Sequence, residues 1–303
     1  MAQITQYYGI DGPVEFADID VSVDNRKFLD PHAIRLAQSP QPFVAAANRA
    51  TSSFFSHVSH CAMSGDAKLR AQGLEMLQHF EEPWETRLGL ASEGFRGHGG
   101  ARDVGSWIWN ALTSDVEALL RIGLLQQIED LPLFVGGVDR DITSDITTRI
   151  VFDQLAAFTA DMLLKHPEIV NGKHQTRRFS RQVWDSDNLS WHKRTMELPL
   201  AEGKPLLLVP SGWVRPTLLM SAGRYYETSV LTWAQLEQAV TSRDGKLLTT
   251  PKDVLRKQTG LIRGRSTNLR LTLRADANGE DLLQTFRQFV DSRHVADTSR
   301  TAA

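Results

Sequence analysis

Apolar residues recur with a helical period through much of the first half of the chain. Between Pro42 and Phe80 they return every three or four positions, with a break near Ser64, which predicts two helices on one buried face. Asp30 followed by Pro31 is typical of a helix start, with the aspartate as N-cap and the proline in the first turn. Helices should therefore dominate this half.

The longest predicted helix covers residues 141–165. A residue that precedes proline avoids the helical conformation, so His166 should end this helix. Another helix should start near Asp103, and Ser114 with Glu117 has the spacing of a capping box for the next one. The apolar stripe of the long helix is formed by Ile142, Ile146, Ile150, Leu155, Phe158 and Met162.

Shorter alternating or continuous apolar runs predict strands. They cover residues 14–23, 131–135, 181–184, 191–198 and 206–209. Glu202-Gly203-Lys204 should form the turn of a hairpin, and helices should return around 223–242, 251–258 and 279–295. These elements predict a helix-rich α+β fold with a small, mostly antiparallel sheet built from 131–135 and 181–209.

The predicted elements fit one compact domain over residues 1–303. The character of the sequence changes near 168–180, so a mainly helical part (1–167) and a mixed α/β part (168–303) are the alternative organisation. Composition is that of an ordinary globular protein, with 41% hydrophobic and 23% charged residues.

Charge and cysteine content narrow the function classes. The net charge of −2 gives no global basic field, so any contact with nucleic acid must come from local patches. The single cysteine, Cys61, excludes an internal disulfide framework and fits a reducing compartment. No run of about 18 apolar residues and no signal peptide is visible. We expect a cytoplasmic protein without a membrane span.

Three aspartates, Asp139, Asp141 and Asp145, follow the apolar run 131–135 within seven positions. Acids in a first helical turn complement the helix dipole and cap its free N–H groups. Asp145 also precedes Arg149 by four positions, the favoured orientation for a helical ion pair. Ordinary helix-start chemistry therefore explains all three.

The alternative interpretation is a metal site. Asp141 and Asp145 would lie one turn apart on one helix face, opposite the isoleucine stripe, and Asp139 could approach them from the preceding loop. Oxygen ligands of this kind suit Mg²⁺ or Mn²⁺, which polarise a phosphoryl group and activate water.

A metal-dependent nuclease of the PD-(D/E)XK type would also need an acid and a lysine two positions apart on a nearby strand. Glu202 and Lys204 have this spacing beside the predicted strand 206–209, and Glu197 on the preceding strand is an equal substitute for the acid. In this hypothesis Asp145, Glu202 and Lys204 are catalytic, and Lys204 stabilises the developing phosphate charge. Glycine between the two residues favours a plain turn instead.

Two further patterns could contact phosphates. Four glycines within residues 94–100 precede a predicted helix, as in phosphate-binding loops, although a surface loop has the same composition. Residues 173–194 and 252–274 are rich in lysine and arginine, and the first strip also holds aromatic residues, a combination that suits nucleic acid. A solvated basic face is the alternative. The candidate nucleic-acid-binding residues are Arg177, Arg178, Arg181, Lys193, Arg194, Arg263, Arg265 and Arg270.

Five segments follow one another along roughly residues 28–230: FLDP, FEEPWETRLGL, GFRGHGG, LFVGGVDRDITSDITTRIV and GKPLLLVP. Together they resemble the sequence signatures of an uncharacterised bacterial protein family associated with mobile elements and phage-defence islands. The most specific part is the block of Asp139, Arg140, Ser144 and Asp145. The resemblance implies defence or nucleic-acid processing and assigns no catalytic residue.

Three hypotheses follow. The first is a metal-dependent, nuclease-like enzyme of bacterial anti-phage defence, with Mg²⁺ or Mn²⁺ held by the three aspartates. The second is a non-catalytic sensor or adaptor that binds nucleic acid, or a protein partner from the same operon, with the acidic helix start purely structural. The third is a transferase or hydrolase that acts on a nucleotide at the glycine-rich loop.

Overall fold

The computed structural model describes residues 2–90, 101–171 and 175–301. It is 53% helical and 14% strand, and the strands form small antiparallel sheets. The helix-rich α+β fold expected from the sequence is thereby confirmed.

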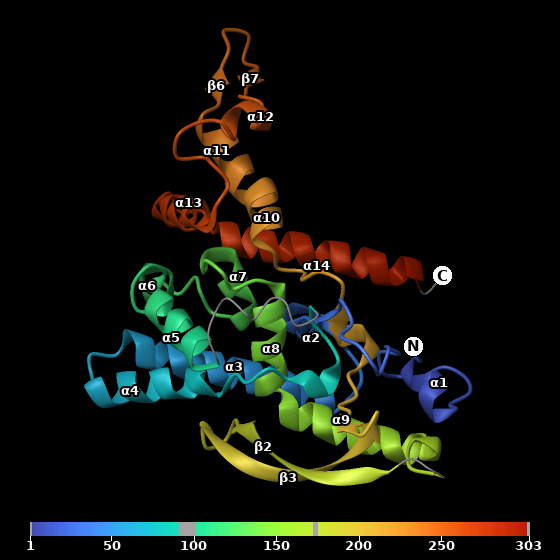
Figure 1. Ribbon diagram of the computed structural model, residues 1–303. Helices are drawn as coiled ribbons and strands as arrows, with labels where there is room; N and C mark the ends of the chain where they lie inside the picture. The colour runs from blue at the N-terminus through green and yellow to red at the C-terminus, as the bar shows by residue number, and fades with distance from the viewer. Residues whose placement is uncertain (1, 91–100, 172–174, 302–303) are drawn as a thin grey trace.

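Helices fill the part of the chain before residue 170 (Figure 1). In the described part of this region, short 3₁₀ turns join them: η1 (Leu77–His79), η2 (Trp84–Thr86), η4 (Ile128–Asp130) and η5 (Pro167–Ile169). The helices are α1 (Ile4–Tyr8), α2 (Pro31–Leu36), α3 (Phe43–Met63), α4 (Ala67–Met76), α5 (Ala101–Leu112), α6 (Glu117–Arg121), α7 (Leu131–Phe134), α8 (Arg140–Ile150) and α9 (Phe152–Lys165).

The described residues also form three small antiparallel sheets. The largest joins β2 (Thr176–Asp185), β3 (Ser190–Ala201) and β4 (Lys204–Pro205), and its long β2–β3 hairpin covers α9 (Figure 1). A second pairs β1 (Phe28–Leu29) with β5 (Val214–Arg215), which follows the 3₁₀ turn η6 (Ser211–Trp213). The third pairs β6 (Val240–Thr241) with β7 (Leu247–Leu248).

The C-terminal segment is helical again. The short helix α10 (Ala222–Tyr225) continues through the π-helical turn η7 (Tyr226–Val230) into α11 (Leu231–Glu237). After the β6–β7 hairpin come α12 (Lys252–Leu255), α13 (Arg265–Ala277) and α14 (Leu282–Thr301), and α14 crosses above the helical part (Figure 1). No helix among the described residues is long and apolar enough to cross a membrane.

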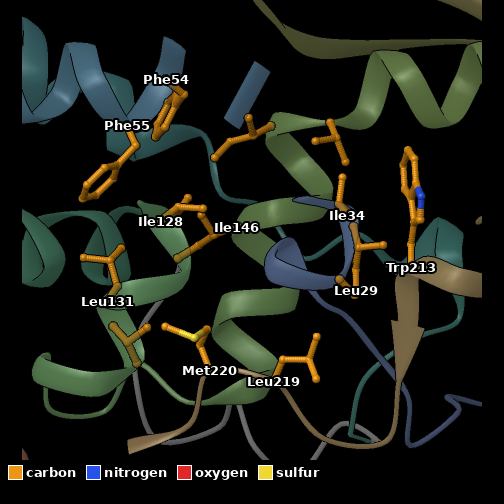
Figure 2. Close-up of a cluster of buried hydrophobic side chains, with 14 of the residues drawn as sticks. Leu29, Ile34, Phe54, Phe55, Ile128, Leu131, Ile146, Trp213, Leu219 and Met220 are labelled. Atoms are coloured by element: carbon orange, nitrogen blue, oxygen red, sulfur yellow. The ribbon is translucent and has the colours of Figure 1, made fainter. Parts of the chain in front are cut away.

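Helix α8 lies at the centre of the molecule. Its Ile146 packs in the core with Phe54 and Phe55 of α3 and Leu131 of α7 (Figure 2). Nine of its eleven residues are buried, including Asp141, Asp145 and Arg149. The metal hypothesis places Asp141 and Asp145 on one face of this helix, opposite the isoleucine stripe, and in the structure both side chains are buried.

Hydrogen bonds from side-chain hydroxyl groups lower the free-energy cost of burying this polar helix. Thr143, Thr147 and Thr148 each donate a hydrogen bond to the backbone carbonyl four residues earlier. A buried hydroxyl without a partner would cost about 1–3 kcal/mol, so these bonds remove the main penalty of burying threonine.

Several predicted elements are confirmed, because their signals are local. Asp30 caps α2 through hydrogen bonds from the backbone N–H groups of His32 and Ala33, with Pro31 in the first turn. Helix α9 ends before His166-Pro167, and the turn at Glu202-Gly203 joins β3 to β4.

Other predicted elements are wrong. The strand expected at 131–135 is helix α7 (Leu131–Phe134), with Val135 as its C-cap. A short apolar run does not distinguish a buried helix from a buried strand, and Pro132 favours a first helical turn. Residues 14–23 form only isolated bridges, at Phe16 and Asp20, and residues 206–209 belong to no strand or bridge. Most of the apolar residues in the two runs are buried, so the apolar pattern reflects burial and not sheet pairing.

Two helix boundaries differ from the prediction, and one helix was not predicted. The helix expected over 141–165 is two helices that meet at Val151, a break that the continuous apolar stripe does not show. Helix α6 begins at Glu117 with Val116 as an N-cap that offers no side-chain bond, and Ser114 bonds back to Asn110, so there is no capping box. Helix α13, within the basic strip 252–274, was not predicted at all.

Candidate functional site

Asp139 is the N-cap of α8. Its Oδ1 accepts hydrogen bonds from the backbone N–H groups of Asp141, at 3.0 Å, and Ile142, at 3.2 Å. The helix-start interpretation is therefore confirmed for this residue. The loop before it fits tightly, because Gly137 has φ +76° and a Cβ there would lie 1.8 Å from the ring of Trp107.

Asp141 and Asp145 lie deeper along α8. The Oδ1 of Asp141 accepts a hydrogen bond from the backbone N–H of Leu90 at 3.1 Å. Asp145 is only 7% exposed, and its carboxylate forms no hydrogen bond with any residue that the structure describes. Burial raises the pKa of both groups, and the nearby charge of Asp139 adds to both effects.

The predicted ion pair between Asp145 and Arg149 is wrong. The Arg149 guanidinium donates instead to the backbone carbonyls of Glu81 and Glu82, and it lies 3.6 Å from a carboxylate oxygen of Glu85. Arg149 is thus held by a neighbouring loop, and Asp145 is left with weak compensation. The pKa of Asp145 lies well above its usual value, since burial and the charges of Asp141 and Glu82 outweigh Arg149.

This arrangement predicts an unusual mutational effect. A raised pKa means that the folded state binds the proton of Asp145 more tightly, so stability falls as pH rises from about 3.8 through the pKa in the folded state. Asp145→Asn, a neutral isostere, should therefore raise the melting temperature at neutral pH and weaken its pH dependence. Thermal melts across this pH range measure both. A lower melting temperature for the variant at neutral pH contradicts the prediction.

The metal hypothesis needs the same three carboxylates. Among the described residues, no three histidine, cysteine, aspartate or glutamate side chains are grouped so that they could hold an ion together. The Mg²⁺ or Mn²⁺ site at Asp139, Asp141 and Asp145 stays a prediction. The melts just described test it when they are repeated with Mn²⁺, because an ion that binds only the folded state raises the melting temperature of the wild type and not of Asp145→Asn.

The proposed catalytic partners lie in another part of the fold. Glu202 and Lys204 are exposed at the β3–β4 turn, where the N–H of Glu202 donates to the hydroxyl of Tyr7 in α1. Glu197, the substitute acid, accepts a hydrogen bond from Thr176 on β2. No contact among the described residues joins any of these three to Asp145.

The eight candidate basic residues fall into two separate groups. Arg177, Arg178, Arg181, Lys193 and Arg194 lie on the β2–β3 hairpin, whereas Arg263, Arg265 and Arg270 lie at or in α13, across the helical layer (Figure 1). Two of the hairpin residues already serve ion pairs, Arg181 with the buried Glu85 and Arg194 with Asp153. The hairpin thus offers Arg177, Arg178 and Lys193 as exposed cations.

A cleft of about 810 Å³ opens where the start of α8 meets α10 and α13. Four guanidinium groups line it, from Arg140, Arg224, Arg263 and Arg265, and none forms an ion pair with a carboxylate of the described chain. We call this feature the arginine cleft. The uncharged part of its wall includes Leu90, Pro132, Met220 and Asn268. The acidic residues on the wall are Asp139 and Glu227.

The four arginines are held to different degrees. Arg265 donates to the carbonyls of Pro132 and Val138, both at 3.0 Å, and so anchors α13 to the loop before α8. Arg140 stacks on the ring of Phe28 at 4.8 Å. Arg224 is exposed and donates one long hydrogen bond, of 3.4 Å, to the carbonyl of Leu219. Arg263 is exposed and forms no hydrogen bond with the rest of the described chain. The cleft therefore has fixed walls and cations that remain available.

A family profile described as a domain of unknown function, DUF8370, matches residues 11–221. The chain belongs to the DUF8370 family. Neither a curated protein nor a solved structure matches it. The match ends where α10 begins, so the arginine cleft lies at the junction between the DUF8370 region and the segment beyond it. Residues 1–221 carry 21 basic and 27 acidic residues, a net −6, whereas residues 222–303 carry 13 and 9, a net +4.

Sequence reasoning found Arg263 and Arg265 but missed Arg140 and Arg224. Arg140 lies next to Asp139 in the sequence, but the three aspartates around it suggested a metal site and not an anion site. Arg224 sits alone among uncharged residues, and no local pattern marks it. The glycine-rich stretch 94–100 lies outside the described residues, so its role as a phosphate loop stays a prediction.

Proposed function

We propose that the protein binds nucleic acid, with the phosphate backbone in the arginine cleft. The observation that carries this is the convergence of four arginines, free of carboxylate partners in the described chain, on one open cleft. A guanidinium presents a planar fork of donors that matches two phosphate oxygens, and such charge-assisted bonds are about twice as strong as neutral ones.

Two helices strengthen the positive character of this cleft. Both α8, which begins at Arg140, and α13, which begins at Arg265, have their N-terminal residue on its wall. The N-terminus of a helix carries a partial positive charge and favours a bound anion. Asp139 already uses two N–H groups of α8, so the side chains supply most of the attraction.

Removing the two most exposed cations tests the proposal. Arg224→Ala with Arg263→Ala should weaken binding of a labelled oligonucleotide by tenfold or more, because each lost charge-assisted bond is worth about 1.5–3 kcal/mol. The slope of log affinity against log salt concentration should also become shallower by about two. Fluorescence anisotropy at several salt concentrations gives both numbers.

The β2–β3 hairpin provides a matched control. Arg177→Ala with Arg178→Ala removes two exposed cations from the opposite part of the molecule and should leave the affinity nearly unchanged. If the hairpin variant loses as much affinity as the cleft variant, the cleft is not the site. A wild type that binds no oligonucleotide at low salt contradicts the proposed function itself.

Metal-dependent cleavage is the second candidate function. One observation favours it: Asp139 lies on the wall of the same cleft, so a metal ion there would meet the bound backbone. The thermal melts with Mn²⁺ described above test this candidate function. The expected links to phage defence, to an operon partner and to the cytoplasm remain predictions beside both candidates.

A further inference from the structure

The β6–β7 hairpin projects from the body of the protein beyond α11 and α12 (Figure 1). We call residues 238–250 the arm. Val240 pairs with Leu248 and Thr241 with Leu247, and a hydrogen bond from Ser242 N–H to Lys246 O closes the turn between the strands. The arm thus has a defined two-stranded shape.

The arm packs against little of the protein. All four paired residues are exposed, with Val240 at 62%, Leu247 at 52% and Leu248 at 48%. An isolated two-stranded hairpin is marginally stable in water, and apolar side chains that gather on a projection mark an interaction site. The arm is therefore expected to be covered when the protein works.

Charge indicates what covers it. Residues 238–270 carry eight lysine and arginine residues and two aspartates, a net charge of +6, although the whole chain has −2. Arg243 and Lys246 lie exposed at the arm's turn, and neither side chain forms an ion pair with a described residue. The same segment continues through Arg263 into the arginine cleft. The helical segment Ala222–Glu237 leads from the cleft wall to the arm and is about 24 Å long, so a polyanion that extends over this length would contact both.

We propose that the arm enters a groove of duplex nucleic acid whose backbone lies in the arginine cleft. The major groove is about 12 Å wide and admits a two-stranded β-ribbon. The chain from Ala239 to Arg243 advances by four residue steps, which reach about 13 Å when extended, more than the groove's depth of about 8.5 Å. Arg243 and Lys246 contact phosphates or base edges, and Leu247 or Val240 contacts thymine methyl groups, which the major groove exposes.

This inference rests on the proposed function and adds a preference for duplex over single strand. Fluorescence anisotropy with a labelled DNA duplex and with one of its strands separates the two claims. Arg243→Ala with Lys246→Ala should lower duplex affinity about tenfold and leave single-strand affinity within about twofold, because a single strand offers no groove. Both residues are exposed, so an unchanged melting temperature is expected.

The variants already described complete the design. The cleft variant Arg224→Ala with Arg263→Ala should lose affinity for both probes, and the hairpin variant Arg177→Ala with Arg178→Ala for neither. If the arm variant binds the duplex as well as the wild type does, the arm has no role and the cleft proposal stands. If it weakens both probes equally, the arm adds general charge, and groove entry is wrong.

A protein partner is the remaining outcome. Leu247→Ser with Leu248→Ser keeps the charge of the arm and removes apolar surface. If this variant binds duplex normally while self-association of the wild type, seen by sedimentation, disappears, the arm is a protein contact and the groove proposal is overturned. If duplex affinity falls, with the mass in solution unchanged, groove entry is supported.

Discussion

Replacing Glu129 by alanine is expected to lower the free energy of unfolding by about 3–5 kcal/mol, the usual cost of leaving a buried charge without its partner. Glu129 is 1% exposed in the turn η4. Its carboxylate accepts two hydrogen bonds from Arg35, and one of its oxygens lies 3.4 Å from the imidazole of His32. Alanine would leave His32 and Arg35 with a cavity in place of an anion.

Loss of Glu129 should also weaken the attachment of the C-terminal helix α14. The other ring nitrogen of His32 lies 2.8 Å from Asp291 of α14, and the neighbour of Glu129, Asp130, is paired with Arg287 of the same helix. These contacts join α2, η4 and α14, so α14 is held to the DUF8370 region by buried polar groups as well as by apolar contacts. Loss of Glu129 should loosen this junction first.

The pH dependence of the stability difference between the wild type and Glu129→Ala gives a more specific test. Burial alone would raise the pKa of Glu129, but the hydrogen bonds and charges of His32 and Arg35 outweigh it and lower the pKa to about 2. This contribution is present above about pH 4.5 and disappears as pH falls toward 2. Burial alone would lower the pKa of His32, but Glu129 and Asp291 raise it, so its contribution is complete below about pH 6.5 and disappears at higher pH.

The free energy of unfolding of the wild type should therefore exceed that of Glu129→Ala by the largest amount between about pH 4.5 and 6.5. Urea denaturation inside and outside this window measures the difference. Glu117→Ala is the matched control, because Glu117 pairs with Arg121 on the surface of α6 and such pairs contribute at most about 1 kcal/mol. Equal losses for the two variants, or a difference that does not vary with pH, would contradict the buried-network interpretation.

The same contrast between local and distant contacts explains what the sequence could predict. The α2 cap at Asp30 and the turn at Glu202-Gly203 were predictable, since both depend on neighbours within a few positions. The short apolar run 131–135 was not, because burial selects apolar residues in helix and strand alike. The arginine cleft could not be predicted from the sequence, because residues 140, 224, 263 and 265 come together only through tertiary packing.

The aspartates of α8 show a different limit. The spacing of Asp145 and Arg149 was right for an ion pair, yet the backbone carbonyls of Glu81 and Glu82 hold the arginine. A loop more than sixty residues away in sequence thus decided the environment of Asp145. Only the folded arrangement shows that this carboxylate is buried with weak compensation, and hence that its removal should stabilise the protein.

Gly105→Ala is expected to destabilise the protein by about 2 kcal/mol net, although alanine is the better helix former. Within α5, alanine in place of glycine would gain about 1 kcal/mol of helix propensity. A Cβ at this position, however, would lie 2.0 Å from the backbone oxygen of Leu77 and 2.6 Å from its carbonyl carbon. A backbone carbonyl cannot rotate away as a side chain can, so α5 must move from η1, at a cost of about 3 kcal/mol.

The displacement should also be felt at the arginine cleft. Trp107, two residues after Gly105, lies against Gly137, and Gly137 precedes the α8 cap Asp139 by two positions. Moving α5 therefore shifts the support of the loop that places Arg140. Urea denaturation and oligonucleotide binding of Gly105→Ala measure the two effects. Gly65→Ala is the control, since a Cβ there meets nothing within 4 Å and the backbone needs no positive φ. A Gly105→Ala protein as stable as this control would mean that α5 and η1 are not in close contact in solution.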